Sequence, residues 1–218
     1  MSSDGVSNWP DGDVILRTHG ADSRDFRVHK LILSLASPVF KDMFTIPQPS
    51  PASSGDIDIV DMMDPPQALE LVLQFIYPSS SPVVGDLALI SEVLVLADKY
   101  NIEAARSRLR PSLMEFAKIE PLRVYAIACR LGFEDEMKIA SSHMKFFDIL
   151  NLTELPNEFK FIPATEYHRL LHARYNELPG TVSAPTFVGI GGQQLSAGQQ
   201  GRENLYGTVM TRRSTVLT

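Results

Sequence analysis

The spacing of apolar residues changes from a strand period to a helical period within the first fifty positions of the chain. Residues 13–18 form a short run rich in β-branched side chains, and residues 26–29 alternate between apolar and polar. These patterns predict two strands joined by the polar turn at residues 21–25. From Leu31 the apolar positions recur at helical spacing, and Pro38 suits the first turn of a new helix. The segment therefore predicts a hairpin followed by two short helices.

Helical spacing of apolar residues continues along most of the remaining chain. It predicts helices over residues 66–77, 87–100 and 102–117, and three more that begin near Pro121, Glu134 and Pro163. Pro111 lies inside the third of these segments, where a proline costs about 3 kcal/mol. We therefore expect Pro111 to divide that segment into two helices. Strands that are few and early, followed by paired helices, predict an α+β fold.

Several short motifs, in order along residues 11–117, resemble a BTB/POZ domain. The first comprises Asp13-Val14, Phe26, Val28-His29-Lys30, Leu33, Ser37, Phe40 and Met43-Phe44. Further matches are a third strand at Asp56-Ile57-Asp58-Ile59, a helix end at Leu73-Gln74-Phe75-Ile76-Tyr77, and the signature Leu96-Ala97-Asp98-Lys99-Tyr100. The chain departs from the family pattern in the Pro/Ser-rich insertion at residues 45–55 and at Tyr77-Pro78-Ser79.

The resemblance implies a domain organisation similar to that of a fungal-type BTB protein. Residues 1–10 would be an N-terminal extension, and residues 11–118 a BTB/POZ fold, a small β-sheet flanked by a cluster of short helices. Residues 119–178 would form an all-α extension that resembles a BACK region. Residues 179–218 are rich in glycine, glutamine and serine without an apolar period, which predicts a disordered tail.

The resemblance also implies a function in protein–protein interaction. A self-association face that forms a homodimer would include Ile32, Leu35, Val39, Phe40, Met43 and Phe44. An adaptor for a cullin-type ubiquitin ligase would contact the cullin through Ile90 and Glu92, and its substrate protein is not identified by the sequence. The alternatives are that Ile90 belongs to the core stripe of its helix, and that the chain is a free-standing oligomerisation or scaffold protein, for example in transcriptional regulation.

Composition restricts the partners and the compartment. A formal net charge of −6 argues against binding of nucleic acid or an anionic membrane surface. The one cysteine, Cys129, indicates a reducing compartment. No signal-peptide pattern and no apolar run of about 18 residues occurs. We therefore expect a soluble protein of the cytoplasm or nucleus, without a membrane partner.

No constellation in the sequence predicts an enzyme, a cofactor or a metal site. His168 and His172 have the i, i+4 spacing of a metal face, but a solvated polar face is the better interpretation. Cys129 lies on the apolar side of its helix, which favours a structural, buried thiol. His29 is interpreted as a residue at the entry of a helix. The remaining polar groups are interpreted as solvated: the acids Asp56, Asp58, Asp61 and Asp64, and the arginines Arg106, Arg108 and Arg110.

Overall fold

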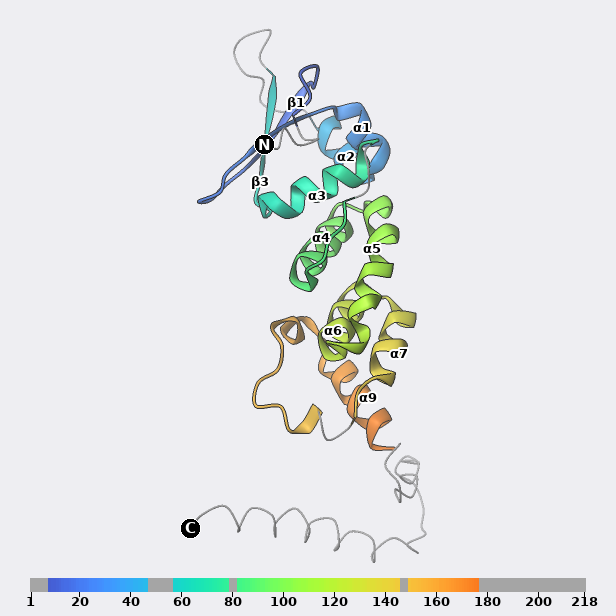
Figure 1. Ribbon diagram of the computed structural model, residues 1–218. Coiled ribbons are helices and arrows are strands. Elements are labelled where there is room, and N and C mark those ends of the chain that lie inside the picture. Colours follow the sequence, from blue (N-terminus) through green and yellow to red (C-terminus); the bar gives the residue numbers. More distant parts are fainter. Residues whose placement is uncertain (1–7, 47–56, 79–81, 146–148, 177–218) are drawn as a thin grey trace, which may run out of the picture. The chain divides into compact units, whose positions relative to one another are not determined.

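A computed structural model describes residues 8–46, 57–78, 82–145 and 149–176, which form a small sheet followed by helices (Figure 1). The predicted tail and most of the Pro/Ser-rich insertion lie outside these residues. No helix in the described ranges is long and apolar enough to cross a membrane. The elements in chain order are β1 Val14–Thr18, β2 Asp25–Val28, α1 Lys30–Ala36, α2 Pro38–Thr45, β3 Asp58–Met62, α3 Pro66–Ile76, α4 Leu87–Lys99, α5 Glu103–Glu115, η1 Phe116–Lys118, α6 Pro121–Leu131, α7 Glu134–Ser142, η2 Asn157–Phe161 and α9 Ala164–Tyr175.

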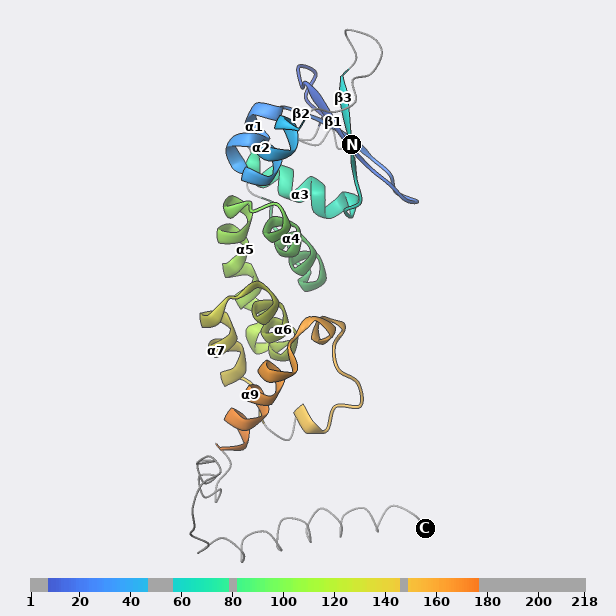
Figure 2. The same cartoon turned by 180° about the vertical axis from the view of Figure 1, so that it is seen from behind.

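The three strands form one sheet in the order β2-β1-β3. β1 pairs antiparallel with β2, as the predicted hairpin requires, and parallel with β3. Both views of the molecule show α1, α2 and α3 on one side of this sheet (Figures 1 and 2). The side chains that point to the helices are apolar and buried: Val14, Leu16, Phe26, Val28 and Met62.

The third strand begins at Asp58, two residues later than predicted. Its even-numbered residues point towards the core and its odd-numbered residues point outward, the reverse of the predicted alternation. Leu16 pairs with Val60 and Ile15 with Ile59. Because paired residues share a face of the sheet, Val60 follows Leu16 towards the core and Ile59 points outward, with 48% of its surface exposed. Asp58 lies on the inner side, where it is only half-exposed and pairs with Lys30. The expectation that Asp58 lies on the solvated side of the strand was therefore wrong.

Asp64, also expected to be solvated, is buried at the exit of β3. The Tyr100 hydroxyl donates a hydrogen bond to one of its carboxylate oxygens, and the Lys99 Nζ lies 2.7 Å from the other. Burial, followed by the bond to Asp64, raises the pKa of Tyr100 to about 12. Asp64 therefore ties the end of β3 to the end of α4.

The predicted corner between α1 and α2 is confirmed at Ser37. The Ser37 hydroxyl accepts a hydrogen bond from the Phe40 N–H, capping α2, and donates one to the Tyr100 carbonyl. Pro38 occupies the first turn of α2. The rings of Phe40 and Tyr100 stack with their centroids 4.7 Å apart. The corner thus rests on the end of α4.

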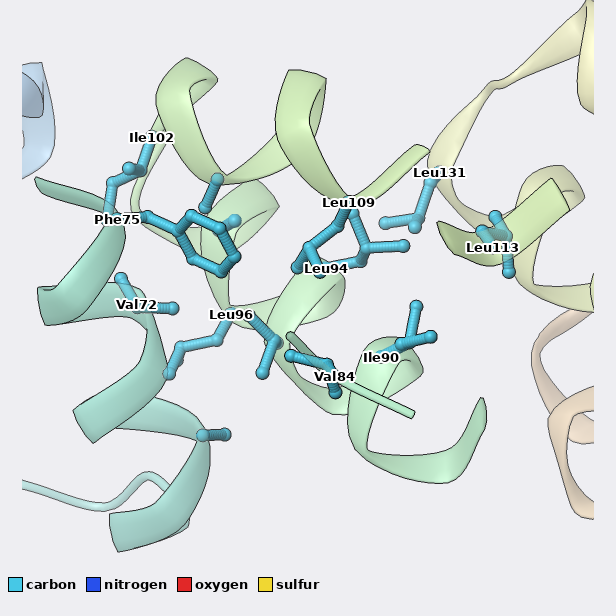
Figure 3. Packing of buried hydrophobic residues seen from close by; sticks show 14 of the residues in the cluster. Val72, Phe75, Val84, Ile90, Leu94, Leu96, Ile102, Leu109, Leu113 and Leu131 are labelled. Atoms are coloured by element: carbon cyan, nitrogen blue, oxygen red, sulfur yellow. The ribbon is translucent and has the colours of Figure 1, made fainter. Parts of the chain in front are cut away.

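One hydrophobic core runs from the sheet through α3, α4 and α5 into α6. Figure 3 shows Val72 and Phe75 of α3, Leu94 of α4 and Leu109 of α5 in this core. Leu131 of α6 belongs to the same cluster. Gly132 ends α6 in the left-handed conformation, with φ of 71°, as its position after the apolar stripe predicts.

α5 continues through Pro111 without a break, so the expected division into two helices was wrong. Pro111 lies on the exposed side of the helix, as does Ser107, whose carbonyl would otherwise accept its missing N–H. On the opposite side, Leu109 and Leu113 are buried. Water can solvate the carbonyl of Ser107 while the packed face holds the helix together.

Two arginines of α5 were expected to be surrounded by solvent, but both contact residues at the start of α7 in the helical extension. Arg110 forms a bidentate ion pair with Glu136 of α7, with distances of 2.6 and 2.9 Å, and its guanidinium lies 4.7 Å from the Phe133 ring centroid. Arg106 also lies over Phe133 and pairs with Asp98. These contacts fasten α7 to α5.

The first described residues lie against the sheet. Trp9 donates its backbone N–H to the Arg27 carbonyl, and its ring stacks on Tyr77 with centroids 5.1 Å apart. His29 precedes α1, as predicted, and donates its backbone N–H to the Tyr77 hydroxyl. Burial raises the pKa of Tyr77.

Candidate interaction surfaces

Three large apolar side chains are exposed together on α1 and at the start of α2. Leu31 is 69% exposed, Leu35 is 81% exposed and Val39 is 36% exposed. Leu31 and Leu35 are one helical turn apart, and Val39 follows across the Ser37 corner. We call this surface the α1–α2 face. Exposed apolar groups that gather in this way are typical of interaction sites.

The structure divides the residues that the sequence assigned to self-association. Leu35 and Val39 lie on the α1–α2 face, and Ile32 is half-buried beside it. Phe40 is completely buried against Tyr100, so its assignment to a contact surface was wrong. Met43 and Phe44 are half-buried and pack against the core.

Leu31 was absent from the predicted face although it is exposed on it. Its spacing of four residues from Leu35 was the available signal, since residues i and i+4 share one side of a helix. Sequence periodicity identifies an apolar stripe, but it does not tell which side of that stripe the rest of the protein covers.

A groove lies between α3 and the segment that leads into α4. Its volume is about 330 Å³, and it is lined by Gln67, Glu70, Leu71, Gln74, Val83, Val84, Gly85, Asp86 and Leu89. The Asp86 carboxylate accepts a hydrogen bond from the Leu89 N–H and so caps α4. Glu70, which also lines the groove, forms an ion pair with Arg24. The groove is therefore lined by apolar side chains together with acidic and amide groups.

The two residues assigned to a cullin contact have different environments. Ile90 is completely buried in the core, which contradicts a surface role for its side chain and agrees with the alternative from periodicity. Glu92 is exposed. Leu89, which lines the groove, lies three residues before Glu92 and so shares its side of α4. Leu89 is the apolar neighbour of Glu92 that the sequence interpretation missed.

The groups considered for chemistry in the C-terminal helices do not form a site in the described residues. His168 and His172 are exposed on α9 with ring centroids 6.1 Å apart. No cluster of three or more metal-ligating side chains occurs in the described ranges. Cys129 is half-buried rather than buried. Its partial burial, followed by the nearby negative charge of Glu166, raises the pKa of the thiol. A raised pKa reduces the thiolate fraction and hence the reactivity.

Comparisons with known proteins agree with the fold. The family model for the BTB/POZ domain matches residues 9–115. The chain is 31% identical over 80 residues to BTB and MATH domain-containing protein 42 of Caenorhabditis elegans, covering 37% of this chain and 19% of the relative. It is 29% identical over 139 residues to Kelch-like ECH-associated protein 1A of Danio rerio, covering 63% of this chain and 22% of the relative.

A further relative and one solved structure extend these comparisons. TD and POZ domain-containing protein 2 of Mus musculus is 25% identical over 161 residues, with 73% of this chain and 42% of the relative covered. The chain thus spans less than half the length of the curated relatives described here. The solved BTB domain of zebrafish PATZ1 aligns with a TM-score of 0.37 at 21% identity, covering 48% of this chain and 76% of that chain.

The family match and the structure describe the same part of the molecule. The matched range begins at Trp9, which already contacts the sheet, and ends with α5. The observed hairpin, helical corner and third strand are the elements that the sequence motifs predict. Residues 9–115 of this chain form a BTB/POZ domain, a protein-interaction fold.

Proposed function

We propose that this chain is an interaction module that self-associates through the α1–α2 face. The observation that carries the proposal is the joint exposure of Leu31, Leu35 and Val39 on adjacent short helices. The core beneath them is already complete, because Leu33 and Phe40 on the inner side of the same helices are fully buried. The exposed residues are therefore available for a second copy.

The exposed apolar side chains of the face can favour association. Burial of each large apolar side chain contributes about 1.5–3 kcal/mol before the cost of association is subtracted. A two-fold arrangement lets the same patch cover itself, because each residue of one copy meets the matching patch of the other. Self-association would thus remove the exposed apolar surface from water on both copies.

Leu35→Glu tests this proposal in the full chain. A carboxylate in the middle of the α1–α2 face would lose its hydration on association, so the weight-average mass in sedimentation should fall below that of wild type. Ile119→Glu is the matched control, because Ile119 is also exposed but lies after η1. A wild type that stays monomeric over a hundredfold range of concentration would disprove self-association.

The groove between α3 and α4 supports a second candidate function, reception of a cullin scaffold. Leu89 offers an apolar contact inside the groove, and Glu92 offers a charge one turn further along α4. An adaptor of this kind would join the cullin to a substrate protein bound elsewhere on the chain. The groove differs from the α1–α2 face in its residues, so one chain could use both.

Glu92→Ala in a cullin pull-down separates the adaptor from a free-standing interaction module. We expect wild type to retain the cullin and Glu92→Ala to retain less, because loss of a central contact commonly costs more than about 1 kcal/mol. Glu103→Ala, an exposed acid at the start of α5, is the control. If wild type retains no cullin, the adaptor function is wrong, whereas the proposal of self-association is not affected by that result.

A further inference from the structure

β3 is an edge strand with a neighbour on one side only, within the residues that the structure describes. The opposite edge of the sheet is partly covered, because Asn8 forms a bridge with Arg27 of β2. An open edge presents a row of backbone N–H and C=O groups that can pair with another strand. Such edges are a recurrent site of strand addition between chains.

The side chains of β3 protect the edge only through two acids, the inward Asp58 and the outward Asp61, and each acid has a partner of its own: Lys30 for Asp58 and His19 for Asp61. Proteins commonly protect an edge with proline or lysine, and residues 58–62 contain neither. Ile59 is 48% exposed on the outer side of the sheet, and Met63, which continues the same alternating row, is 85% exposed. Ile57 precedes Ile59 in this row and is half-exposed. The outer row of the edge thus carries three apolar side chains, Ile57, Ile59 and Met63, with the exposed Asp61 between the last two.

We propose that β3 pairs antiparallel with β3 of a second copy, about a two-fold axis at Val60. The two three-stranded sheets would then form one six-stranded sheet. The proposed interface is distinct from the α1–α2 face in its residues and uses backbone hydrogen bonds as well as side-chain contacts. It does not depend on the function proposed for that face.

The residue order of β3 selects this register. Centring on Val60 places Ile57 opposite Met63 of the second copy and brings the two Ile59 side chains to diagonal positions, where residues of neighbouring strands still interact. Residues with the same parity face each other in this register, so the buried sides of both sheets remain on the same side. Ile57 and Met63 therefore meet directly across the interface, whereas Ile59 stands opposite Asp61 and contacts the second Ile59 only diagonally.

The two acids of β3 disfavour two of the neighbouring registers. If the two-fold axis lay midway between Ile59 and Val60, Asp58 would stand opposite Asp61 of the second copy. If the axis lay at Asp61, the two Asp61 residues would stand opposite each other. Like charges directly opposite each other destabilise a strand pair. In the register centred on Val60 each aspartate faces an apolar residue, and each keeps its own partner: Lys30 for Asp58 and His19 for Asp61.

Sedimentation of the full chain with four variants tests the proposal. Ile59→Lys places a charge on the edge, and Ile139→Lys is the matched control, because Ile139 is 47% exposed on α7, away from β3. Wild type should exceed the mass of a dimer at high concentration, and Ile59→Lys should stop at the dimer. Leu35→Glu should also stop at a dimer, and the double variant Leu35→Glu/Ile59→Lys should be monomeric.

Each part of this design identifies a different failure. If Leu35→Glu leaves the mass unchanged, the α1–α2 face is wrong, whereas the edge is wrong if Ile59→Lys behaves as Ile139→Lys does. Hydrogen exchange gives a second readout, since strand pairing should slow exchange of backbone amides in residues 58–62 at least tenfold as concentration rises. Association without that protection would overturn the proposal.

Discussion

Glu136 is an acid that the sequence places at the start of a helix and that the structure buries beside a half-exposed arginine, Arg110, with which it forms an ion pair. Glu134, Asp135 and Glu136 form the acidic first turn of α7, as predicted. Only Glu136 turns inward, where the hydrogen bonds from Arg110 lower its carboxyl pKa against the opposing effect of burial. Its partner lies 26 positions earlier in the chain, so local spacing did not reveal the pair.

The lowered pKa makes a prediction about stability and pH. A carboxyl whose pKa is lower in the folded state stabilises the protein above its ordinary pKa, near 4.5, and loses that contribution as pH falls through the folded value. Glu136→Gln should cost about 1–3 kcal/mol at pH 7, and the difference from wild type should shrink towards pH 3. Urea unfolding at both pH values measures it.

Asp135→Asn is the control for this experiment, because Asp135 is exposed in the same turn. Its stability should follow that of wild type at both pH values, since a surface pair contributes roughly 0–1 kcal/mol. An equal loss of stability in both variants would show that the helix dipole, and not the pair with Arg110, gives Glu136 its effect.

Residue-scale exposure was the least predictable property of the candidate surfaces. Phe40 and Leu35 belong to the same apolar pattern, but Phe40 packs on Tyr100 and Leu35 faces solvent. Ile90 and Leu89 are adjacent, and only Leu89 reaches the groove. Periodicity places a residue on a helix face, whereas its exposure depends on elements distant in the sequence.

At the scale of elements, the Ser37 corner should control how α1 and α2 present their exposed side. Ser37→Ala removes both the cap of α2 and the hydrogen bond to the Tyr100 carbonyl. Loss of a capping hydroxyl costs about 0.5–2 kcal/mol, and the unpaired buried groups add to it. We expect a lower free energy of unfolding and weaker self-association.

Tyr100→Phe separates these effects, because it removes the hydroxyl that bonds Asp64 and keeps the backbone carbonyl that Ser37 contacts. It should lower stability without weakening association at concentrations where the protein is folded. If Ser37→Ala associates as tightly as wild type, the corner does not position the α1–α2 face.

Most helices could be located from the sequence, because proline and glycine mark their ends. Pro38, Pro66 and Pro121 lie in first turns, and Gly132 ends α6. Pro111 misled the prediction, since the buried side of α5 outweighs one missing hydrogen bond. The phase of β3 was also missed, because Ile59 and Val60 are adjacent and only pairing with β1 decides which points inward.

At the scale of the whole molecule, the hydrophobic core extends beyond the family match. The match ends at residue 115, but Leu113 of α5 shares one core with Val124 and Ile127 of α6. The sequence placed a boundary at residue 118, and that boundary remains a prediction. The continuous core nevertheless implies that the two parts stabilise each other.

A chain that ends at Lys118 should therefore be less stable than the full chain. Removal of α6 takes apolar residues away from the core that Leu113 shares, and removal of α7 takes away the partners of Arg110. The cost is roughly 1.5–3 kcal/mol for each large apolar side chain uncovered. Thermal unfolding should show a clearly lower midpoint. A midpoint equal to that of the full chain would show that residues 9–118 fold independently of the extension.

The architecture was predictable because the motifs of the BTB/POZ family include the order of hairpin, corner and helices. The surfaces were less predictable, since Leu31, Leu35 and Leu89 become sites only through what the folded chain leaves uncovered. The open edge of β3 has no sequence signal of its own, because strand order is a property of the assembled sheet.

The stacking of Trp9 on Tyr77 makes the fluorescence of Trp9 a measure of whether the sheet is folded. Trp9 is the one tryptophan of the chain, and it lies at 5.1 Å from a tyrosine that joins the sheet to α3. Its fluorescence therefore follows the sheet, whereas far-ultraviolet circular dichroism follows all helices, including α6, α7 and α9. Melting curves from the two signals will superimpose if the BTB/POZ domain and the extension unfold as one unit, and will separate if they do not.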